Sequence, residues 1–325
     1  MQRRQLLQYL AAAGPASSLA PAWAQDGGYP SKPVRLIVAS APGALLDSAS
    51  RLYADRMAAV LKQPVVVDNV AGASSLLAAR NVARGDADGY TLLTASNTLV
   101  TLPHLNAKAG YAMKEFAPVG EMARSPSILV AGSGTPFTSI ADLVAHAKKR
   151  PDEITYASGG MGTTSHLPVE LFARQAGIKL RHIPYKGISL AVPDVVAGRV
   201  DFLMGTPTSL AALIQAKSLR ALAITSESRS PKFPEVPTFK ELGLTDATYE
   251  IWVGVLAPAA LPAAVQARLA SAMEVARNDA AVKAKLEGMG QSISNVRTPA
   301  QFEAVLRADE ERYRKLIKEA NIVAD

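Results

Sequence analysis

The sequence Ser-Gly-Gly-Met-Gly-Thr-Thr-Ser-His at residues 158–166 decides how the rest of the chain is interpreted. It follows a short β-like run at residues 154–157 and precedes an apolar segment, residues 167–173, that we predict to be a helix. Three glycines in five positions let the backbone approach another molecule closely and adopt positive φ. Hydroxyl side chains follow where the helix begins, and the free N–H groups of a helix N-terminus favour an anion. Taken alone, the stretch also fits a tight turn with Ser165 as an ordinary N-cap.

Length and composition indicate a globular protein of two lobes. The chain has 325 residues, which exceeds one typical domain and suits two lobes of about 100 to 150 residues. It has no cysteine, which excludes disulfides, thiolate nucleophiles and thiolate metal sites. Its four histidines include no HExxH pair, so we expect neither a metal site nor a cofactor.

The formal net charge is +7, and the basic residues are scattered without a lysine or arginine block. This distribution makes nucleic acid a poor candidate partner. The surplus of positive charge modestly favours anionic small molecules.

The first 25 residues have the pattern of an export signal. Arg3 and Arg4 come before a modestly apolar run at residues 6–19, and an Ala-Trp-Ala sequence ends at Ala24. The arginine pair resembles a twin-arginine signal, so we predict export to the periplasm with cleavage near Ala24 and Gln25. A membrane anchor is disfavoured because the run is short and broken by a glycine and a proline. Lipid attachment is excluded by the lack of a cysteine.

Strands alternate with helices along most of the remaining chain, which predicts layered α/β lobes with mainly parallel sheets. A short polar loop follows each of four predicted strands, and in open α/β sheets ligands bind at this edge. The first two loops belong to one lobe and the last two to the other, so facing lobes would bring all four to one cleft. The loops are residues 41–47, 96–98, 158–164 and 205–209.

The C-terminal part is predicted to return to the first lobe. Residues 251–256 form a strand-like run, and the sequence Thr-Pro-Ala-Gln at residues 298–301 is a capping box for a final helix. In that helix six apolar residues share one face, which we expect to pack against the sheet: Phe302, Val305, Leu306, Tyr313, Leu316 and Ile317. The predicted division is a signal at residues 1–25, one lobe from residues 26–126 and 251–325, and a second lobe from residues 127–250.

The order and spacing of ten short landmarks carry a family resemblance. Over its whole mature length the chain resembles the periplasmic solute receptors of tripartite tricarboxylate transporters, also called Bug receptors. Each landmark is weak alone, but the set is specific. The landmarks are residues 29–38, 41–43 with Asp47, 63–67, 88–93, 116–119, 156–167, 184–187, 219–223, 234–238 and 256–258.

The resemblance implies a Venus-flytrap fold that captures a small carboxylate and delivers it to a membrane permease. The receptor is expected to act as a monomer. In such receptors main-chain N–H groups, hydroxyls and water hold the carboxylate, and none of the four loops here carries Lys or Arg. Ser158 and Thr163 are the preferred carboxylate contacts, whereas we favour a structural role at the helix start for His166. Asp47 fits either a helix-start carboxylate or a cleft residue. The ligand-binding residues that the resemblance implies are Pro42, Gly43, Ala44, Leu45, Leu46, Asp47, Ser96, Asn97, Thr98, Ser158, Gly159, Gly160, Gly162, Thr163, Thr164, His166, Gly205, Thr206 and Pro207.

Two departures from the family pattern bear on the ligand. The first loop commonly reads Pro-Gly-Gly-Gly-x-Asp, but here Gly43 is followed by Ala44, Leu45 and Leu46, which either narrow the cleft or give it an apolar wall. The fourth loop often carries Asp-Asn where this chain has Gly205 and Thr206. Without that acidic group, a carboxylate with an aliphatic or aromatic body is expected rather than an amino acid.

Two other functions remain open from the sequence. A receptor that signals to a membrane sensor kinase would use the same closed form as a transport receptor, with a hinge near residues 125–127 and 249–252. A periplasmic hydrolase is disfavoured because the sequence has no G-x-S-x-G motif and no paired carboxylates in the predicted cleft. Ser158 or Ser165 near His166 could form a nucleophile and base, but no third residue is apparent. We therefore expect a binding protein that is not an enzyme.

Overall fold

The computed structural model describes residues 28–106, 108–319 and 322. The predicted export signal lies outside these residues. Within them, none of the helices is both long enough and apolar enough to cross a membrane.

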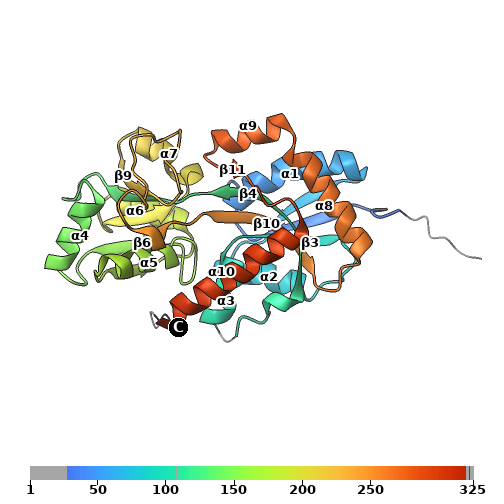
Figure 1. Ribbon diagram of the computed structural model, residues 1–325, viewed down its shortest axis with the longest axis horizontal. Helices are drawn as coiled ribbons and strands as arrows, with labels where there is room; N and C mark the ends of the chain where they lie inside the picture. The colour runs from blue at the N-terminus through green and yellow to red at the C-terminus, as the bar shows by residue number, and fades with distance from the viewer. Residues whose placement is uncertain (1–27, 107, 320–321, 323–325) are drawn as a thin grey trace, which may run out of the picture.

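The chain forms two lobes, each built on its own sheet (Figure 1). The first lobe has a six-stranded sheet in the order β11-β4-β10-β3-β1-β2. Its strands are β1 (Val34–Val38), β2 (Val65–Asn69), β3 (Thr91–Ala95), β4 (Phe116–Ser125), β10 (Ile251–Pro258) and β11 (Ser292–Ile293). Its helices are α1 (Leu45–Leu61), α2 (Leu76–Ala83), α3 (Thr98–Leu105), α8 (Ala263–Arg277), α9 (Ala280–Gly288) and α10 (Pro299–Glu319), with short 3-10 turns η1 (Ala73–Ser75) and η2 (Met113–Glu115).

The second lobe has a five-stranded sheet in the order β7-β6-β8-β5-β9. Its strands are β5 (Ile128–Gly132), β6 (Thr155–Ser158), β7 (Arg181–Pro184), β8 (Phe202–Gly205) and β9 (Leu219–Ile224). Its helices are α4 (Ile140–Lys149), α5 (Leu167–Ala176), α6 (Ile188–Val196) and α7 (Pro207–Gln215), with the 3-10 turn η3 (Thr245–Ala247). The predicted two-lobed α/β fold is confirmed, and the strand predicted at residues 154–157 is β6, one residue further along the chain.

Both sheets are mixed in direction. In the first lobe β1 pairs in parallel with β2 and β3, whereas β10 runs antiparallel to β3 and β4. In the second lobe β6 pairs in parallel with β7 and β8, whereas β5 runs antiparallel to β8 and β9. The antiparallel pairs arise because the chain leaves the first lobe through β4 and β5 and returns beside them through β9 and β10. The expectation of mainly parallel sheets therefore holds for β1, β2 and β3 in the first lobe and for β6, β7 and β8 in the second.

The outgoing and returning segments are hydrogen-bonded to each other where they pass between the lobes. Ser127 N donates to Thr225 Oγ1 at 2.8 Å, and Thr225 N donates to Ser127 O at 2.9 Å. Tyr249 N donates in turn to Thr225 O at 3.0 Å. We call these three residues the strand crossing. Ser127 and Thr225 are buried, so water does not compete for these bonds.

Helix α10 is fixed at its start by local sequence and along its length by packing. Gln301 N donates to Thr298 Oγ1 at 3.1 Å and Thr298 N donates to Gln301 Oε1 at 3.2 Å, so the predicted capping box is confirmed. The apolar face packs on β4 and α3, and Phe302 is fully buried. The Phe302 ring occupies the space above Gly254, where an added Cβ would lie 2.2 Å from it, and meets Trp252 edge-on with ring centroids 5.3 Å apart.

Replacing Phe302→Ala should lower the free energy of unfolding by about 3–5 kcal/mol, because the change leaves a cavity beneath α10. Urea denaturation followed by circular dichroism measures the effect. Val275→Ala is the control, since Val275 on α8 is 51% exposed and its truncation should change stability by less than about 1 kcal/mol. Equal stability of the two variants would show that α10 is not held by this ring.

Candidate ligand-binding site

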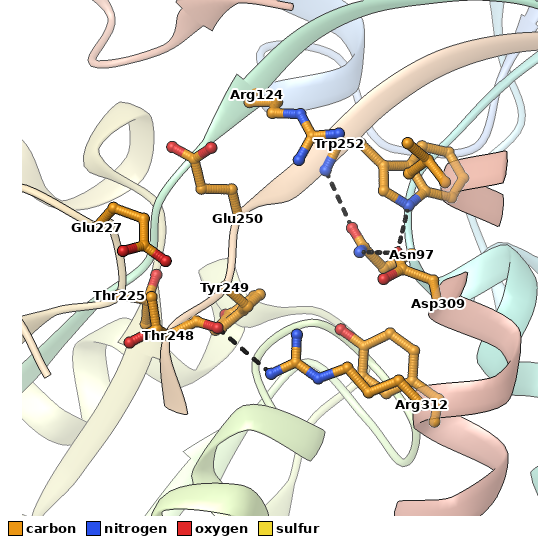
Figure 2. Close-up of a pocket in the computed structure, with 12 residues that line it drawn as sticks. Asn97, Arg124, Thr225, Glu227, Thr248, Tyr249, Glu250, Trp252, Asp309 and Arg312 are labelled. Atoms are coloured by element: carbon orange, nitrogen blue, oxygen red, sulfur yellow. Dashed lines mark hydrogen bonds between the residues drawn. The ribbon is translucent and has the colours of Figure 1, made fainter. Parts of the chain in front are cut away.

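The second polar loop, residues 96–98, connects β3 to α3 and is buried at every position. The Asn97 side chain turns toward Trp252 of β10 and Asp309 of α10 (Figure 2). Its Oδ1 accepts the N–H of Trp252 at 3.1 Å, and its Nδ2 donates to Asp309 Oδ2 at 2.7 Å. Asn97 therefore fixes the loop to the returning strand and to the C-terminal helix, while Thr98 begins α3.

The third polar loop, residues 158–164, is organised by its own hydroxyls. Ser158 Oγ accepts the N–H of Gly160 at 3.0 Å, and Ser165 Oγ accepts the N–H of Gly159 at 2.9 Å. Thr163 Oγ1 donates to Gly160 O at 2.7 Å. The residue at the N-cap position of α5 is His166, not Ser165, because the Ser165 hydroxyl is directed back to the glycines.

Two buried imidazoles support this loop from behind. His166 Nδ1 accepts the N–H of Gly162 at 3.1 Å, and His182 Nε2 lies 2.6 Å from Ser158 Oγ. The His166 and His182 rings stack with centroids 4.2 Å apart, and His182 stacks on Tyr156 at 4.8 Å. Burial lowers the pKa of His166 to about 3, with His182 adding to the shift, and burial lowers the pKa of His182 to about 4. Both rings are neutral at pH 7, which agrees with the structural role expected for His166.

The second and third loops meet across the lobes. Thr101 Oγ1 on α3 donates to Gly162 O at 2.8 Å. Around this contact is a hollow with about 140 Å³ of empty space, too narrow to admit a water molecule. Its lining residues are Asn97, Thr98, Thr101, Gly162, Thr163, Thr164, Leu167, Pro168 and Tyr313. Five of the predicted ligand-binding residues are thus brought together, and the structure is closed at this point.

The first polar loop, residues 41–47, is held by Asp47. Its carboxylate accepts the N–H of Gly43 at 2.8 Å, Asn69 Nδ2 at 2.9 Å and the Arg51 guanidinium at 2.9 Å. Burial pushes the pKa of Asp47 upward, but the hydrogen bonds from Arg51, Gly43 and Asn69 outweigh it and hold the pKa below its usual range. Asp47 is 3% exposed and fully partnered, so it shapes the loop and leaves exposed Pro42 and Gly43 at its tip.

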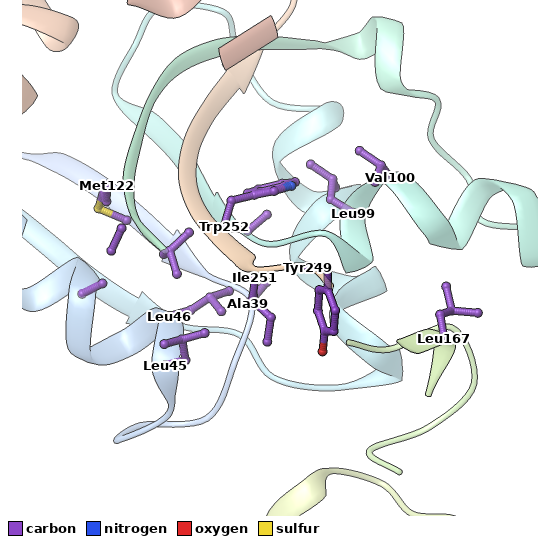
Figure 3. Close-up of a cluster of buried hydrophobic side chains, with 14 of the residues drawn as sticks. Ala39, Leu45, Leu46, Leu99, Val100, Met122, Leu167, Tyr249, Ile251 and Trp252 are labelled. Carbon is purple, nitrogen blue, oxygen red and sulfur yellow. The ribbon is translucent and has the colours of Figure 1, made fainter. Parts of the chain in front are cut away.

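Leu45 and Leu46 give the first loop a buried apolar side. They are 7% and 8% exposed and belong to a hydrophobic cluster with Ala39 and Ile251. Figure 3 shows both leucines at the start of α1, facing the part of the returning strand that carries Ile251. Both side chains are thus part of the hydrophobic core, and an apolar wall of the cleft formed by them stays a prediction.

The fourth polar loop, residues 205–209, contacts the first lobe at a different point. Thr208 Oγ1 donates to Met289 O at 3.1 Å, and Pro207 lies against Gly290, where an added Cβ would be 2.5 Å from the proline ring. Gly205 is buried at the end of β8, and Thr206 Oγ1 pairs with Ser209 Oγ at 2.8 Å. Among the described residues, no hydrogen bond joins the first or the fourth loop to the second or the third.

Tyr249 is a site residue that sequence reasoning did not single out. Its hydroxyl donates to Ser127 Oγ at 2.7 Å and lies 2.9 Å from Thr164 O, so one side chain joins the strand crossing to the third loop. Burial strongly raises the pKa of this phenol, which therefore remains a donor. The available signal was its position in the predicted returning hinge segment, where a buried hydroxyl requires a partner.

The fold and the meeting of polar loops from two lobes define a binding protein of the periplasmic type. The family model described as "Tripartite tricarboxylate transporter family receptor" matches residues 49–322. The chain belongs to this family of solute-binding receptors, as its sequence resemblance predicted. A UPF0065 protein of a Pseudomonas species, from the tcbD-tcbE intergenic region, is 36% identical over 299 residues, covering 91% of this chain and 89% of the relative.

Solved structures show the same fold. Periplasmic binding protein BugD has a TM-score of 0.83 at 29% identity, covering 91% of this chain and 100% of BugD. Rpa4515 of R. palustris, solved with adipate, has a TM-score of 0.84 at 30% identity, with 91% and 99% covered. MatC of Rhodopseudomonas palustris, solved with bound malate, has a TM-score of 0.82 at 26% identity, with 89% and 100% covered.

The buried imidazoles make stability depend on pH. An unfolded histidine binds a proton below about pH 6.5, whereas folded His166 does so only near pH 3. The free energy of unfolding is therefore highest above pH 6.5 and decreases as the pH falls and the unfolded state takes up the proton. The free energy of unfolding should drop by about 2 kcal/mol between pH 7 and pH 5 from His166 alone. Urea denaturation of wild type and His166→Gln at both pH values measures the part of this drop that comes from His166. An identical pH dependence in the two proteins would contradict the assignment.

Proposed function

We propose that this receptor captures a small carboxylate between its lobes and delivers it to the membrane permease of a tripartite tricarboxylate-type transporter. The observation that carries the proposal is the meeting of the second and third loops, which bring hydroxyl and N–H groups from both lobes together without a lysine or arginine. Such groups at helix starts suit an anion. The two structural relatives solved with adipate and malate support a carboxylate ligand.

The carboxylate contacts proposed first are Thr98, Thr163 and the N–H group of Thr164, which line the closed hollow. Ser158 is fully buried and its hydroxyl is engaged by His182 and Gly160, so we assign it to shaping the loop. The first and fourth loops would form the remaining walls when the lobes open and reclose around a ligand.

Opening is proposed to rotate one lobe, residues 26–126 with 251–325, against the other, residues 127–250. The strand crossing supports this division because the two segments there are the connections between the sheets. Export to the periplasm after cleavage near Ala24, and action as a monomer, belong to the same proposal.

The body of the ligand is proposed to be apolar. Leu45 and Leu46 replace the glycines common in the family, and their buried cluster supports an apolar wall beside the carboxylate seat. Gly205 and Thr206 leave the fourth loop without an acidic partner for an ammonium group. A dicarboxylate or monocarboxylate with an aliphatic or aromatic body fits both features.

Catalysis by a serine is disfavoured by burial. Ser158 and His182 are 2.6 Å apart, as a nucleophile and base would be, but the serine is fully buried beneath its own loop. We propose binding without turnover. A sensor-kinase partner would use the same closed form, and carboxylate uptake by cells with and without the permease distinguishes the two partners.

A thermal-shift screen of the protein tests the proposed ligand class. Adipate, malate, benzoate and glutamate are compared, because a ligand at a hundredfold excess over Kd stabilises the folded state by about 2.7 kcal/mol. The expected result is a raised melting temperature with adipate or benzoate and a smaller shift with glutamate. A shift with glutamate alone would overturn the apolar-body assignment, and no shift with any carboxylate would overturn the proposed function.

Replacing Gly162→Ala should weaken carboxylate binding at least tenfold. Gly162 has a left-handed backbone with φ +72, and an added Cβ would lie 2.1 Å from Leu105 of the other lobe. The contact with Leu105 crosses between the lobes and opposes closure, whereas the strain of about 1–2 kcal/mol in the backbone destabilises the loop itself. Calorimetric titration with adipate measures the change. Gly134→Ala is the matched control, since nothing lies within 4 Å of its added Cβ, and equal affinities of the two variants would contradict closure at Gly162.

A further inference from the structure

A second cavity, of about 200 Å³, lies beside the strand crossing and beneath α10 (Figure 2). We call it the crossing cavity. Its lining includes Thr225, which follows β9 in the second lobe, Arg124 on β4 in the first lobe, and Arg312 on α10. Of the ligand-binding residues predicted from the sequence, Asn97 alone lines it. The full lining is Asn97, Arg124, Thr225, Glu227, Thr248, Tyr249, Glu250, Trp252, Val305, Asp309, Arg312 and Tyr313.

Three of the five charged residues in this lining already have strong partners. Arg124 forms a two-pronged pair with Glu121, at 2.6 and 2.9 Å. Glu227 pairs with Lys240 at 2.6 Å. Asp309 accepts two hydrogen bonds of 2.7 Å, from Asn97 Nδ2 and Trp252 Nε1. Because these three charged groups already have partners, they are not available to pair with a charged ligand in the cavity.

Within the described residues, the other two charged side chains, Glu250 and Arg312, form no direct ion pair. Glu250 has no hydrogen bond or ion pair from its carboxylate within the described part of the chain. Burial raises the pKa of Glu250, and the Arg124 guanidinium partly offsets the shift. Arg312 donates only to main-chain oxygens, Asp246 O at 2.8 Å and Thr248 O at 3.3 Å, and no described carboxylate lies within 4 Å of it. The two side chains approach the cavity from different walls (Figure 2).

A ligand that pairs with both Glu250 and Arg312 must carry a positive and a negative charge. An arginine without a carboxylate is a strong site for one, because the planar guanidinium forms two parallel hydrogen bonds with it. A partly buried glutamate without a partner favours an ammonium. A metal ion is excluded among the described residues, since no three acidic or histidine side chains are placed to hold one. The volume is below the roughly 300–1,000 Å³ of drug-sized pockets, so the guest is small.

We propose that the crossing cavity binds a small zwitterion, whose carboxylate pairs with Arg312 and whose ammonium pairs with Glu250. Thr225 and Thr248 supply further polar atoms to the same lining. The cavity shares Asn97 and Tyr313 with the hollow between the loops, but Arg312 and Glu250 do not line that hollow. The proposed binding of the zwitterion therefore does not depend on the identity of the carboxylate ligand.

Trp252 provides a signal for the test because its indole lines the cavity. The chain has two tryptophans, so the full chain carrying Trp23→Phe reports Trp252 alone. This protein is titrated with glycine, β-alanine, 4-aminobutanoate and 5-aminopentanoate, followed by fluorescence and calorimetry. Butanoate and butylamine serve as half-molecules with one charge each. We expect one chain length to bind with a change in Trp252 emission, and each half-molecule to bind at least tenfold more weakly.

Charge-removing variants locate the bound zwitterion. Arg312→Gln and Glu250→Gln should each weaken its binding at least tenfold. Arg314→Gln is the matched control, because Arg314 lies on the same helix, pairs with Glu311 and does not line the cavity. Absence of binding by every zwitterion to the wild-type cavity overturns the proposal, whether or not the variants fold. Binding of butanoate as tightly as the zwitterion, or affinities unchanged in both variants, overturns it as well.

Discussion

The hydrogen bonds among Ser127, Thr225 and Tyr249 are the constraint on which the rest of the structure depends. They join the outgoing and returning segments between two sheets that share no strand. Each sheet therefore keeps its own pairing whatever the angle between the lobes. The groups that must change contacts on opening are the loops at the strand ends, which is where the polar, glycine-rich sequences are found. On the proposed opening, a short bonded crossing would confine motion to the loop surfaces proposed to receive a ligand.

Tyr249 and α10 extend this constraint to the loops themselves. The Tyr249 hydroxyl joins Ser127 to the carbonyl of Thr164, so the crossing is bonded directly to the third loop. On the other side, Arg312 of α10 donates to the carbonyl of Thr248 next to Tyr249. The loop, the crossing and the C-terminal helix form one hydrogen-bonded series. A rearrangement of the loop must break or lengthen a buried bond, which favours two distinct arrangements over gradual deformation.

Local features could be predicted from the sequence, whereas side-chain directions could not. The strands, the capping box at Thr298 and the positions of the polar loops follow from patterns within a few residues, and these predictions are confirmed. Asp47 was left open because its partner Asn69 lies on β2, 22 residues away in sequence. The support of Ser158 by His182 depends on the register of β6 and β7, which places His182 opposite Tyr156. Contacts between elements set these directions, and no local pattern encodes that register.

The distribution of formal charge distinguishes the two cavities physically. The loops that meet across the lobes offer hydroxyls and N–H groups, and these neutral groups can be exposed and buried repeatedly at small desolvation cost. Formal charges at those surfaces would have to shed water on each closure, a cost of several kcal/mol per ion that only a perfectly placed partner offsets. The charged side chains instead line the crossing cavity, where Arg124 and Asp309 already hold their partners in the closed form. In the proposed closure, charge beside the crossing and dipoles at the loops would let the lobes close readily while the charged groups keep a fixed geometry.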